Sequence, residues 1–390
     1  MSSDAVPPEP FASPLTRRRF IGRSAGAALA IGSTSAFLAA CGGSGGGGDD
    51  SVTVLSWVAY VTPDIQRQFK KDTGITLRGV PAESDQDMFT KVKAGGGGQY
   101  DIVMANCGWC PLYYDNGLTE PFDLSEVRGS DQLYPDFVEG RDLPYVRPDG
   151  KVLIYPNMWG ALGLAWNTSV DYQPEQPYSW NALWSDQVPE GKVMMAGAGE
   201  DFLATAGLAL GVDRNAVYSM RGAELRRAEE KLKQLMPFQW NRSVDPDFRS
   251  AIRSERAWIG ESTTLGSAPI LNAEAGREIA KVVIPEEGSL GWIDGPQLVK
   301  GAKRRANALK FMEWFGTNQW CQDYLFDEYS NAQCNKAQVD RVLNSRPDRA
   351  TRAEQVQANH PEVAKQLAFQ RQPDDLQAWT AAYDRVLAAG

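Results

Sequence analysis

Histidine is scarce in this chain of 390 residues and the chain lacks an excess of basic residues, and both facts exclude several classes of protein. The single histidine, His360, precedes a proline at a predicted helix start, and it cannot by itself build a Ser-His-Asp triad or a histidine-rich zinc site. The 49 acidic residues outnumber the 40 basic ones and give a formal charge of −9, whereas nucleic-acid binding needs a basic surface. We therefore expect no metal, no cofactor and no nucleic-acid partner.

Long apolar runs are also absent from the sequence. A membrane-spanning helix needs about 20 predominantly apolar residues, whereas residues 25–36 form a short run that is rich in Gly, Ser and Ala. This run follows Arg17–Arg19 and ends in the Leu-Ala-Ala-Cys of 38–41. Such a pattern is typical of a secretory signal, and paired arginines indicate twin-arginine export of a folded protein. The last four residues resemble a lipobox, so we expect residues 1–40 to be removed and Cys41 to carry a lipid.

Glycine dominates the segment that begins at Cys41. Residues 41–50 read CGGSGGGGDD, and such a run predicts a flexible tether with a reach of about 15–18 Å. Without residues 1–40, which hold four arginines and two acidic residues, the formal charge is −11. We expect a folded body that is held at a membrane of the periplasm or cell envelope.

Four cysteines remain besides the lipobox cysteine: Cys107, Cys110, Cys321 and Cys334. An exported protein meets an oxidising compartment, so an even number of cysteines suggests disulfides. Three pairings are conceivable, and we favour Cys107–Cys110 with Cys321–Cys334. The Cys-Gly-Trp-Cys of 107–110 also follows a predicted strand and precedes a predicted helix. That is the setting of a thiol–disulfide redox pair, in which a helix amino terminus lowers a thiol pKa.

Strands and helices alternate at the start of the body. Residues 52–57 predict a buried strand, and a helix should begin at Pro63 with Thr62 as its cap and end at Gly74. Further strands are predicted at 75–80 and 100–105, separated by a helix that starts at Ser84 and stops in the glycines of 95–98. This order implies parallel strands with crossover helices.

The rest of the body has a mixed pattern. Its predicted strands cover 159–166, 192–195 and 281–284, its helices cover 202–210, 223–236 and 303–326, and a helical turn covers 180–184. About 340 residues suffice for two lobes with substantial cores. The 12 Trp, 13 Tyr and 14 Phe supply bulk for these cores, and we expect Trp180 and Trp184 to belong to one of them.

Five segments, in order, resemble the extracellular solute-binding proteins of ABC importers, and within them the spermidine/putrescine-binding branch. They are SWVAYV at 56–61, YDIV at 100–103, SWNALW at 179–184, KLKQLMP at 231–237 and GWID at 291–294. The similarity covers nearly all of residues 51–335. It implies an α/β, two-lobed periplasmic-binding-protein fold with hinge strands and a ligand cleft between the lobes. The implied lobes are 51–160 plus 292–339 and 161–291 plus 340–390.

The resemblance also implies a ligand site for an amine. Trp57 and Tyr60 would line one wall from the first lobe, while Trp292 and Asp294 would stand at the hinge side. A carboxylate would then meet an ammonium group, and the indole would pack on the methylene chain. A cation over an aromatic face contributes about 0.5–2 kcal/mol, and a hydrogen bond between charged groups is stronger than a neutral one.

The sequence departs from the family pattern in the anionic set. The family has an Asp-x-x-Glu pair in the second lobe, where this chain has Ala198 in place of the aspartate and Asp201 in place of the glutamate. The remaining candidates are Asn106 and Trp109 in a wall segment, and Trp258 and Glu261 farther along. Structural roles stay open for two of the acids, since Asp201 can cap a helix and Asp294 can belong to a turn. The reduced acid set leaves a polyamine, a shorter diamine or another amine as the ligand.

We therefore expect the substrate-binding lipoprotein of an ABC transporter, without catalysis. It would capture a polyamine or a related small cationic amine in the interlobe cleft and deliver it to the membrane permease, and it would be a monomer. Two alternatives stay open. One is a thiol–disulfide redox protein that uses Cys107 and Cys110, and the other is a scaffold or sensor lipoprotein that keeps the fold without transport.

Overall fold

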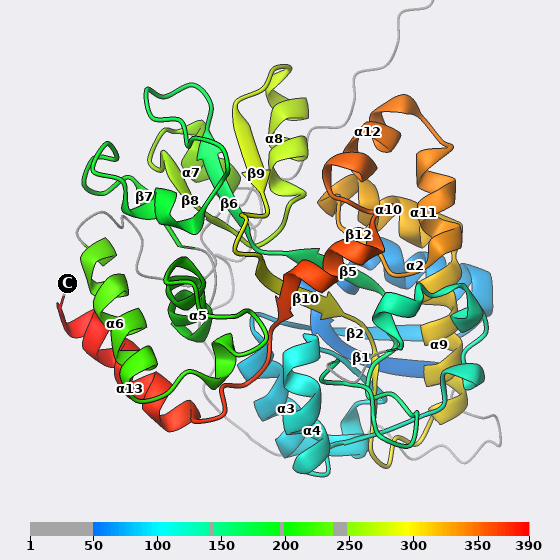
Figure 1. Cartoon of the computed structure of the whole chain (residues 1–390). Helices are drawn as coiled ribbons and strands as arrows, with labels where there is room; N and C mark the ends of the chain where they lie inside the picture. Colours follow the sequence, from blue (N-terminus) through cyan, green and yellow to red (C-terminus); the bar gives the residue numbers. More distant parts are fainter. Residues whose placement is uncertain (1–49, 140–142, 196–198, 237–247, 390) are drawn as a thin grey trace, which may run out of the picture. The chain divides into compact units, whose positions relative to one another are not determined.

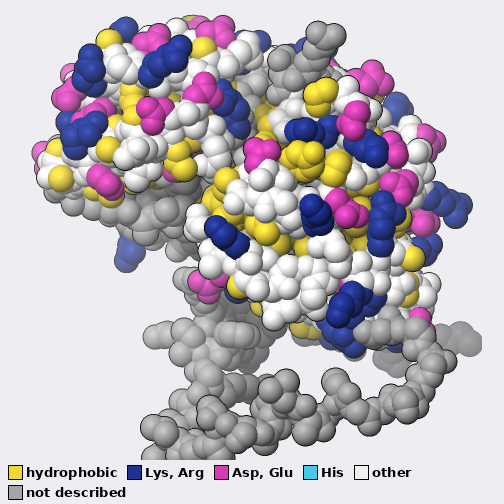
Figure 2. Space-filling view, turned by 90° about the horizontal axis from the view of Figure 1, so that it is seen from below, with side chains coloured by type: hydrophobic (Ala, Val, Ile, Leu, Met, Phe, Trp, Pro, Cys, Tyr) yellow, Lys and Arg dark blue, Asp and Glu magenta, His cyan; other side chains and the backbone are white. Residues whose placement is uncertain are grey.

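The computed structural model describes residues 50–139, 143–195, 199–236 and 248–389, and these belong to one compact unit (Figure 1). The predicted signal, nearly all of the predicted tether, Cys41 and Ala198 lie outside the described residues. Among the described residues, no helix combines the length and the apolar character that crossing a membrane requires. Figure 2 shows Lys and Arg side chains mixed with Asp and Glu over the face that it presents, a pattern that is typical of a solvated surface.

The first sheet confirms the alternation that the sequence predicts. Its strand order is β2-β1-β3-β11-β4, and β1 is parallel to both β2 and β3. The strands are β1 (Ser51–Trp57), β2 (Thr76–Ala82), β3 (Ile102–Met104), β4 (Thr119–Glu120) and β11 (Gln297–Val299). The crossover helices are α2 (Pro63–Thr73) and α3 (Asp85–Gln99). As predicted, Thr62 Oγ1 caps α2 by accepting a hydrogen bond from the backbone N–H of Ile65, and Gly74 ends the helix in the left-handed region.

A second and a third sheet follow. The second has the order β12-β5-β10-β13 and the third the order β7-β8-β6-β9. The second sheet contains β5 (Met158–Ala161), β10 (Ser289–Asp294), β12 (Ala332–Gln333) and β13 (Leu367–Phe369). The third contains β6 (Gly163–Asn167), β7 (Val193–Met194), β8 (Ile259–Ser262) and β9 (Ala280–Val283). The predicted single strand at 159–166 is therefore wrong, because β5 pairs with β10 whereas β6 pairs with β8 and β9.

Helices cover the sheets and pack on one another. Besides α2 and α3, the described helices are α4 (Cys110–Asp115), α5 (Gly199–Ala209), α6 (Ala223–Leu235), α7 (Phe248–Arg253), α8 (Ser267–Ala275), α9 (Arg305–Thr317), α10 (Gln319–Tyr329), α11 (Lys336–Leu343), α12 (Pro347–Gln355) and α13 (Leu376–Ala389). The 3-10 turns are η1 (Val58–Tyr60), η2 (Cys107–Trp109), η3 (Leu124–Glu126), η4 (Ser130–Gln132), η5 (Pro135–Phe137), η6 (Trp180–Trp184), η7 (Val217–Ser219) and η9 (Pro361–Gln366). The predicted turn at 180–184 is confirmed, and Trp180 is fully buried.

Two helix predictions are wrong. The single helix predicted for 303–326 is divided between α9 and α10, because Asn318 leaves the helical region and its side chain caps α10 at the N–H of Cys321. In addition, α3 continues through the glycines that were expected to stop it, with a local break at Gly96. One of these glycines is required by packing, since a Cβ on Gly97 would lie 2.4 Å from the carbonyl carbon of Gly301.

The C-terminal segment packs in two places. The helix α13 contacts α5 and α6, whereas α11 and α12 contact each other and α11 also contacts α10 and β12 (Figure 1). Ion pairs reinforce the second group, since Asp327 on α10 pairs with Arg352 on α12 at 3.0 Å and also with Arg349. The predicted lobe boundaries stay a prediction.

Candidate functional site

The first pair of predicted site residues meets where β1 and β10 end. The hydroxyl of Tyr60, in η1 directly after β1, donates a hydrogen bond of 2.9 Å to Oδ2 of Asp294 at the end of β10. Tyr60 is buried, and its ring packs edge-on against Phe315. Burial raises the pKa of the Asp294 carboxyl to about 6, although the hydrogen bond from Tyr60 lowers it in part. The carboxyl ends of strands are where ligands of α/β proteins bind.

Asp85 is a carboxyl group in the same place that sequence reasoning missed. It begins α3, and its Oδ1 accepts a hydrogen bond of 3.0 Å from the backbone N–H of Asn106. Asn106 in turn forms an isolated antiparallel bridge with Asp294. Burial raises the pKa of Asp85 to about 7, and the negative charges of Asp294 and Asp201 add to the rise. The available signal was its position just after β2, at the carboxyl edge of a parallel sheet.

Gln370 joins the first group of residues to the second. The side-chain amide of Asn106 donates a hydrogen bond of 2.8 Å to Oε1 of Gln370, and Nε2 of Gln370 donates one of 2.8 Å to Oδ2 of Asp201. The other oxygen of Asp201 accepts a hydrogen bond of 2.8 Å from the hydroxyl of Tyr218. Gln370 follows β13 at the far end of the chain, and no motif in the sequence pointed to it or to Tyr218.

The helix α5 presents two polar side chains one turn apart. Asp201 and Thr205 lie on one face at positions i and i+4, and the hydroxyl of Thr205 donates a hydrogen bond of 2.7 Å to Oε1 of Glu261 on β8. Glu261 is fully buried, and Asp201 is 7% exposed. The nearby charges of Asp201 and Glu261 help to raise the pKa of Tyr218 well above its usual range, after burial as the main cause. One buried acid therefore lies on α5, and a second lies beside it on β8.

The predicted aromatic residues occupy different environments. The indole N–H of Trp292 donates a hydrogen bond of 2.8 Å to the carbonyl of Thr263, and its ring covers Gly160, where a Cβ would lie 2.4 Å from a ring carbon. Trp57 is partly buried, and its indole N–H has no hydrogen-bond partner among the described residues. The partly buried Trp109 packs on Phe89, and Trp258 packs on the main core. The hydrogen-bonded network described above does not include these last three indoles.

A family model matches residues 65–333, more than half of the chain, and its description is bacterial extracellular solute-binding protein. The chain belongs to this family. The solute-binding protein is 27% identical over 282 residues to the spermidine/putrescine-binding periplasmic protein of Escherichia coli strain K12. This alignment covers 70% of this chain and 76% of the relative. It is 23% identical over 322 residues to the putrescine-binding periplasmic protein PotF of the same strain. That alignment covers 79% of this chain and 84% of the relative.

Solved structures confirm the two-lobed α/β fold of the solute-binding protein. A putative spermidine/putrescine ABC transporter protein from Listeria monocytogenes superposes with a TM-score of 0.70 at 21% identity and covers 87% of this chain and 99% of its own. The Atu4243-GABA receptor superposes with a TM-score of 0.64 at 18% identity and covers 87% and 97%. The predicted family and fold class are thus confirmed.

The disulfides favoured from the sequence are wrong. Cys107, Cys110, Cys321 and Cys334 are free and buried in the structure. Two of these thiols face carbonyl oxygens instead, since Sγ of Cys107 contacts the carbonyl of Gln370 and Sγ of Cys110 contacts that of Asn106, both at 3.9 Å. Export implies an oxidising compartment, and an even number of cysteines permits full pairing, but neither observation shows whether the thiols face one another.

The redox alternative also loses its chemical basis. Burial raises the pKa of the Cys107 and Cys110 thiols well above their usual range, and the charges of Asp85 and Asp294 add to the rise. A reactive thiol needs the opposite, a lowered pKa at an accessible position. The lowered pKa expected from a helix start is therefore wrong, because desolvation outweighs the helix terminus. We find no support for a thiol–disulfide function in the described residues.

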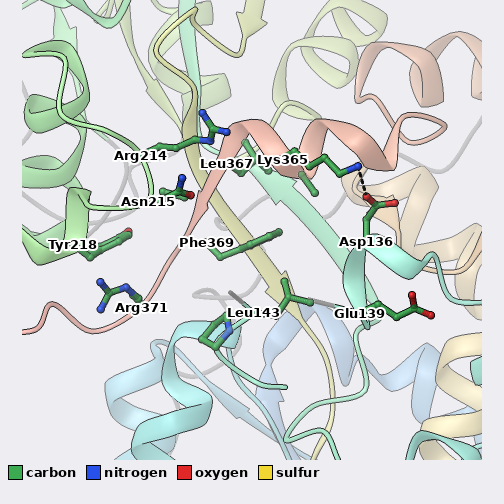
Figure 3. Close-up of a pocket in the computed structure, with 13 residues that line it drawn as sticks. Asp136, Glu139, Leu143, Arg214, Asn215, Tyr218, Lys365, Leu367, Phe369 and Arg371 are labelled. Carbon is green, nitrogen blue, oxygen red and sulfur yellow. Dashed lines mark ion pairs between the residues drawn. The ribbon is translucent and has the colours of Figure 1, made fainter. Parts of the chain in front are cut away.

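A hollow of about 670 Å³ lies beside the network, at the outer edge of β13 (Figure 3). Arg214 and Tyr218 line it on one side, and Asp136 and Lys365, an ion pair at 3.5 Å, line it on the other. Tyr218 lines this hollow, and its hydroxyl donates the hydrogen bond to Asp201. Tyr218 thus belongs both to the hollow and to the acidic network.

Proposed function

We propose that this solute-binding protein is the substrate-binding lipoprotein of an ABC importer. It captures a polyamine or a related small cationic amine between its two lobes and hands the solute to a membrane permease, without a catalytic step. The observation that carries the proposal is the acidic network, in which Tyr60 and Asp294 from the first side are linked through Asn106 and Gln370 to Asp201.

The chemistry of the network favours a cationic solute. Burial raises the pKa of Asp85 and Asp294, which means that the ionised forms of both carboxyls lack compensation in the ligand-free site. A bound ammonium group would supply that compensation and hydrogen-bond donors at once. The names of the relatives, which bind spermidine or putrescine, agree with this chemistry.

Aromatic residues would hold the methylene chain of the solute. We assign this role to Trp57, Trp258 and Trp292, with Trp109 at the edge of the wall, and we assign the ammonium contacts to the hydrogen-bonded acids. Glu261 would act next to Asp201 in the second lobe. An alkyl chain buried between indole rings contributes about 0.8 kcal/mol per CH₂, so the length of the chain would set the affinity.

Closure of two lobes would couple binding to transport. We keep the predicted lobes, 51–160 plus 292–339 and 161–291 plus 340–390, as the working division. The contacts of α11 with α10 and β12 favour one revision, which moves α11 and α12 to the first lobe and leaves α13 with the second. A ligand shifts the open–closed equilibrium only by its higher affinity for the closed form.

The protein would be exported folded and anchored by Cys41 in the periplasm or cell envelope, as a monomer. The periplasmic relatives support the compartment, and the lipobox-like Leu38–Cys41 supports the anchor. Replacement of Cys41 by Ser should move the protein from the membrane fraction to the soluble fraction. Retention of the Cys41→Ser protein in the membrane fraction would contradict the anchor.

The test of the function is a thermal-shift screen of the purified protein. A solute that binds only the folded state raises the melting temperature by mass action. The screen contains putrescine, spermidine and agmatine, the zwitterion GABA, amino acids, sugars and organic anions. We expect a rise with the amines. A rise with GABA or an anion alone would keep the receptor and reject the amine, and no rise with any solute would favour a scaffold or sensor that keeps the fold without transport.

A further inference from the structure

Asp85 carries a carboxyl group of the network that lies outside the five sequence segments on which the family resemblance rests. Asp85 lies on the first turn of α3, and one of its oxygens is used by the backbone N–H of Asn106. Its second oxygen, Oδ2, has no hydrogen-bond partner among the described residues. The same holds for Oδ1 of Asp294, whose other oxygen accepts the bond from Tyr60.

These two carboxyl groups flank one backbone segment. The N–H of Asn106 faces Asp85, and Asn106 also pairs with Asp294 through an isolated bridge. The side chain of Asn106 is held by Gln370, which fixes the segment between the two acids. The two carboxyls are close enough that the charge of Asp294 influences Asp85. A primary alkylammonium has three N–H donors, enough for both unused oxygens with one donor to spare.

We propose that Asp85 is a further ligand-binding and specificity-determining residue, which joins Asp294 in binding one primary ammonium end of the solute. The opposite end of a diamine would then meet Asp201, which lies on the other side of Gln370. This inference rests on the proposed amine-binding function and adds to it the requirement for an unsubstituted terminal ammonium group, since each added methyl group removes one donor.

A purely structural role is the alternative explanation for Asp85. Its bond to the N–H of Asn106 fastens the start of α3 to the loop after β3, and an uncharged acceptor would do this equally well. Asparagine keeps one oxygen acceptor and nearly the same shape, but it loses the charge and has an NH₂ donor in place of the second oxygen. The variant Asp85→Asn therefore separates the two roles.

The pH dependence of ligand affinity distinguishes the two roles, because a purely structural role of Asp85 would not change it. Protonated Asp85 resembles Asn, whereas ionised Asp85 can bind an ammonium, so the variant and the wild type should differ only where Asp85 ionises on binding. No Lys or Arg contributes to the raised pKa of Asp85 among the described residues. The groups that interact with it electrostatically are all acidic when they ionise: Tyr60, Cys107, Cys110, Tyr113, Asp201 and Asp294.

The experiment measures the affinity of wild type and Asp85→Asn for putrescine by calorimetry at two pH values. We expect the variant to bind about tenfold or more weakly at about pH 8, and to lie within about threefold of the wild type at about pH 5. Asp87→Asn is the matched control, because Asp87 lies on the same turn but pairs with Lys91 at 2.7 Å. This control should equal the wild type at both pH values.

Equal losses at both pH values, or no loss at about pH 8, would overturn the role of Asp85 and leave the amine-binding function intact. A wild type that binds no amine at either pH would overturn the proposed function, and the inference about Asp85 with it. A second comparison uses putrescine and its doubly N-trimethylated analogue. We expect the wild type to prefer putrescine and the preference to shrink in Asp85→Asn, whereas an unchanged preference would contradict the inference.

Discussion

Tyr60 and Asp294 are 234 positions apart in the chain, yet the tyrosine hydroxyl donates a hydrogen bond of 2.9 Å to the carboxylate. The bond joins the turn after the first strand to the end of β10, a strand of the second sheet. In the proposed ligand site, this bond would link one wall of the site to the hinge strand. The bond also lowers the pKa of Asp294 in part, so it affects the charge of that carboxyl group.

Replacement of Asp294 by Asn should weaken amine binding while the fold survives. The carboxylate loses its charge, and a hydrogen bond between charged groups is worth about 1.5–3 kcal/mol, so the affinity for putrescine should fall at least about tenfold. The melting temperature without ligand should not fall, because a buried charge is removed. Calorimetric titration and thermal unfolding measure the two effects. Unchanged affinity would remove Asp294 from the site.

Replacement of Tyr60 by Phe should shift the pH dependence of binding. The hydroxyl lowers the pKa of Asp294 in part, so its removal should raise that pKa above about 6. The pH below which amine affinity declines should then move upward, with a modest loss near neutral pH. The profile of affinity between about pH 5 and pH 8 shows this. A profile with an unchanged midpoint would mean that the hydroxyl does not set the charge of Asp294.

The stability of the ligand-free protein should fall as the pH rises from about 4 to 7. Burial raises the pKa of Asp294 to about 6 and of Asp85 to about 7, above the unfolded value of about 3.9. Between these values the folded state holds more protons than the unfolded state, so the free energy of unfolding declines with pH. Urea unfolding at a series of pH values measures the decline.

The double variant Asp85→Asn/Asp294→Asn is the control for this pH dependence. It should flatten the decline of stability between about pH 4 and 7, because neither side chain titrates. Putrescine should also flatten the decline in the wild type, since a bound cation lowers both pKa values. An equally steep decline in the double variant would assign the effect to other groups.

Local signals in the sequence account for much of the fold. The run from β1 to β3 was predicted because apolar periodicity, the Thr62 cap and the Gly74 terminator agree with one another. The predictions that were wrong concern long-range pairing. The apolar run of β5 and β6 does not show that its halves pair in different sheets, and Asn318 breaks a helix through a side-chain bond that propensity does not reveal.

The site was predictable only in part, and for the same reason. The resemblance selected Tyr60, Asn106, Asp201 and Asp294, which the structure joins in one network. It missed Gln370, whose bond to Asn106 spans 264 positions. A lone glutamine near the end of a chain carries no local pattern, so only the folded structure reveals its place between Asn106 and Asp201.

Replacement of Gln370 by Ala should loosen the connection between Asn106 and Asp201. The amide bonds to both side chains at 2.8 Å, and the loss of one neutral hydrogen bond and one to a carboxylate should cost about 2–4 kcal/mol of unfolding free energy. We also expect a larger radius of gyration without ligand by X-ray scattering, which putrescine should reverse. Gln372→Ala, two residues farther along, is the control and should leave both quantities unchanged. An unaltered radius in Gln370→Ala would mean that other contacts hold the lobes.

The four buried thiols should resist modification in the native protein and react once it unfolds. Burial raises their pKa well above the usual range for Cys107, Cys110, Cys321 and Cys334, and thiolates are the reactive form. A thiol reagent at neutral pH should therefore label none of these four before denaturant is added and all of them afterwards. The Cys41→Ser variant keeps the lipobox cysteine out of the assay. Labelling of fewer than four after denaturation without reductant would reveal a disulfide and contradict the free thiols, whereas rapid native labelling of Cys107 or Cys110 would revive a redox role.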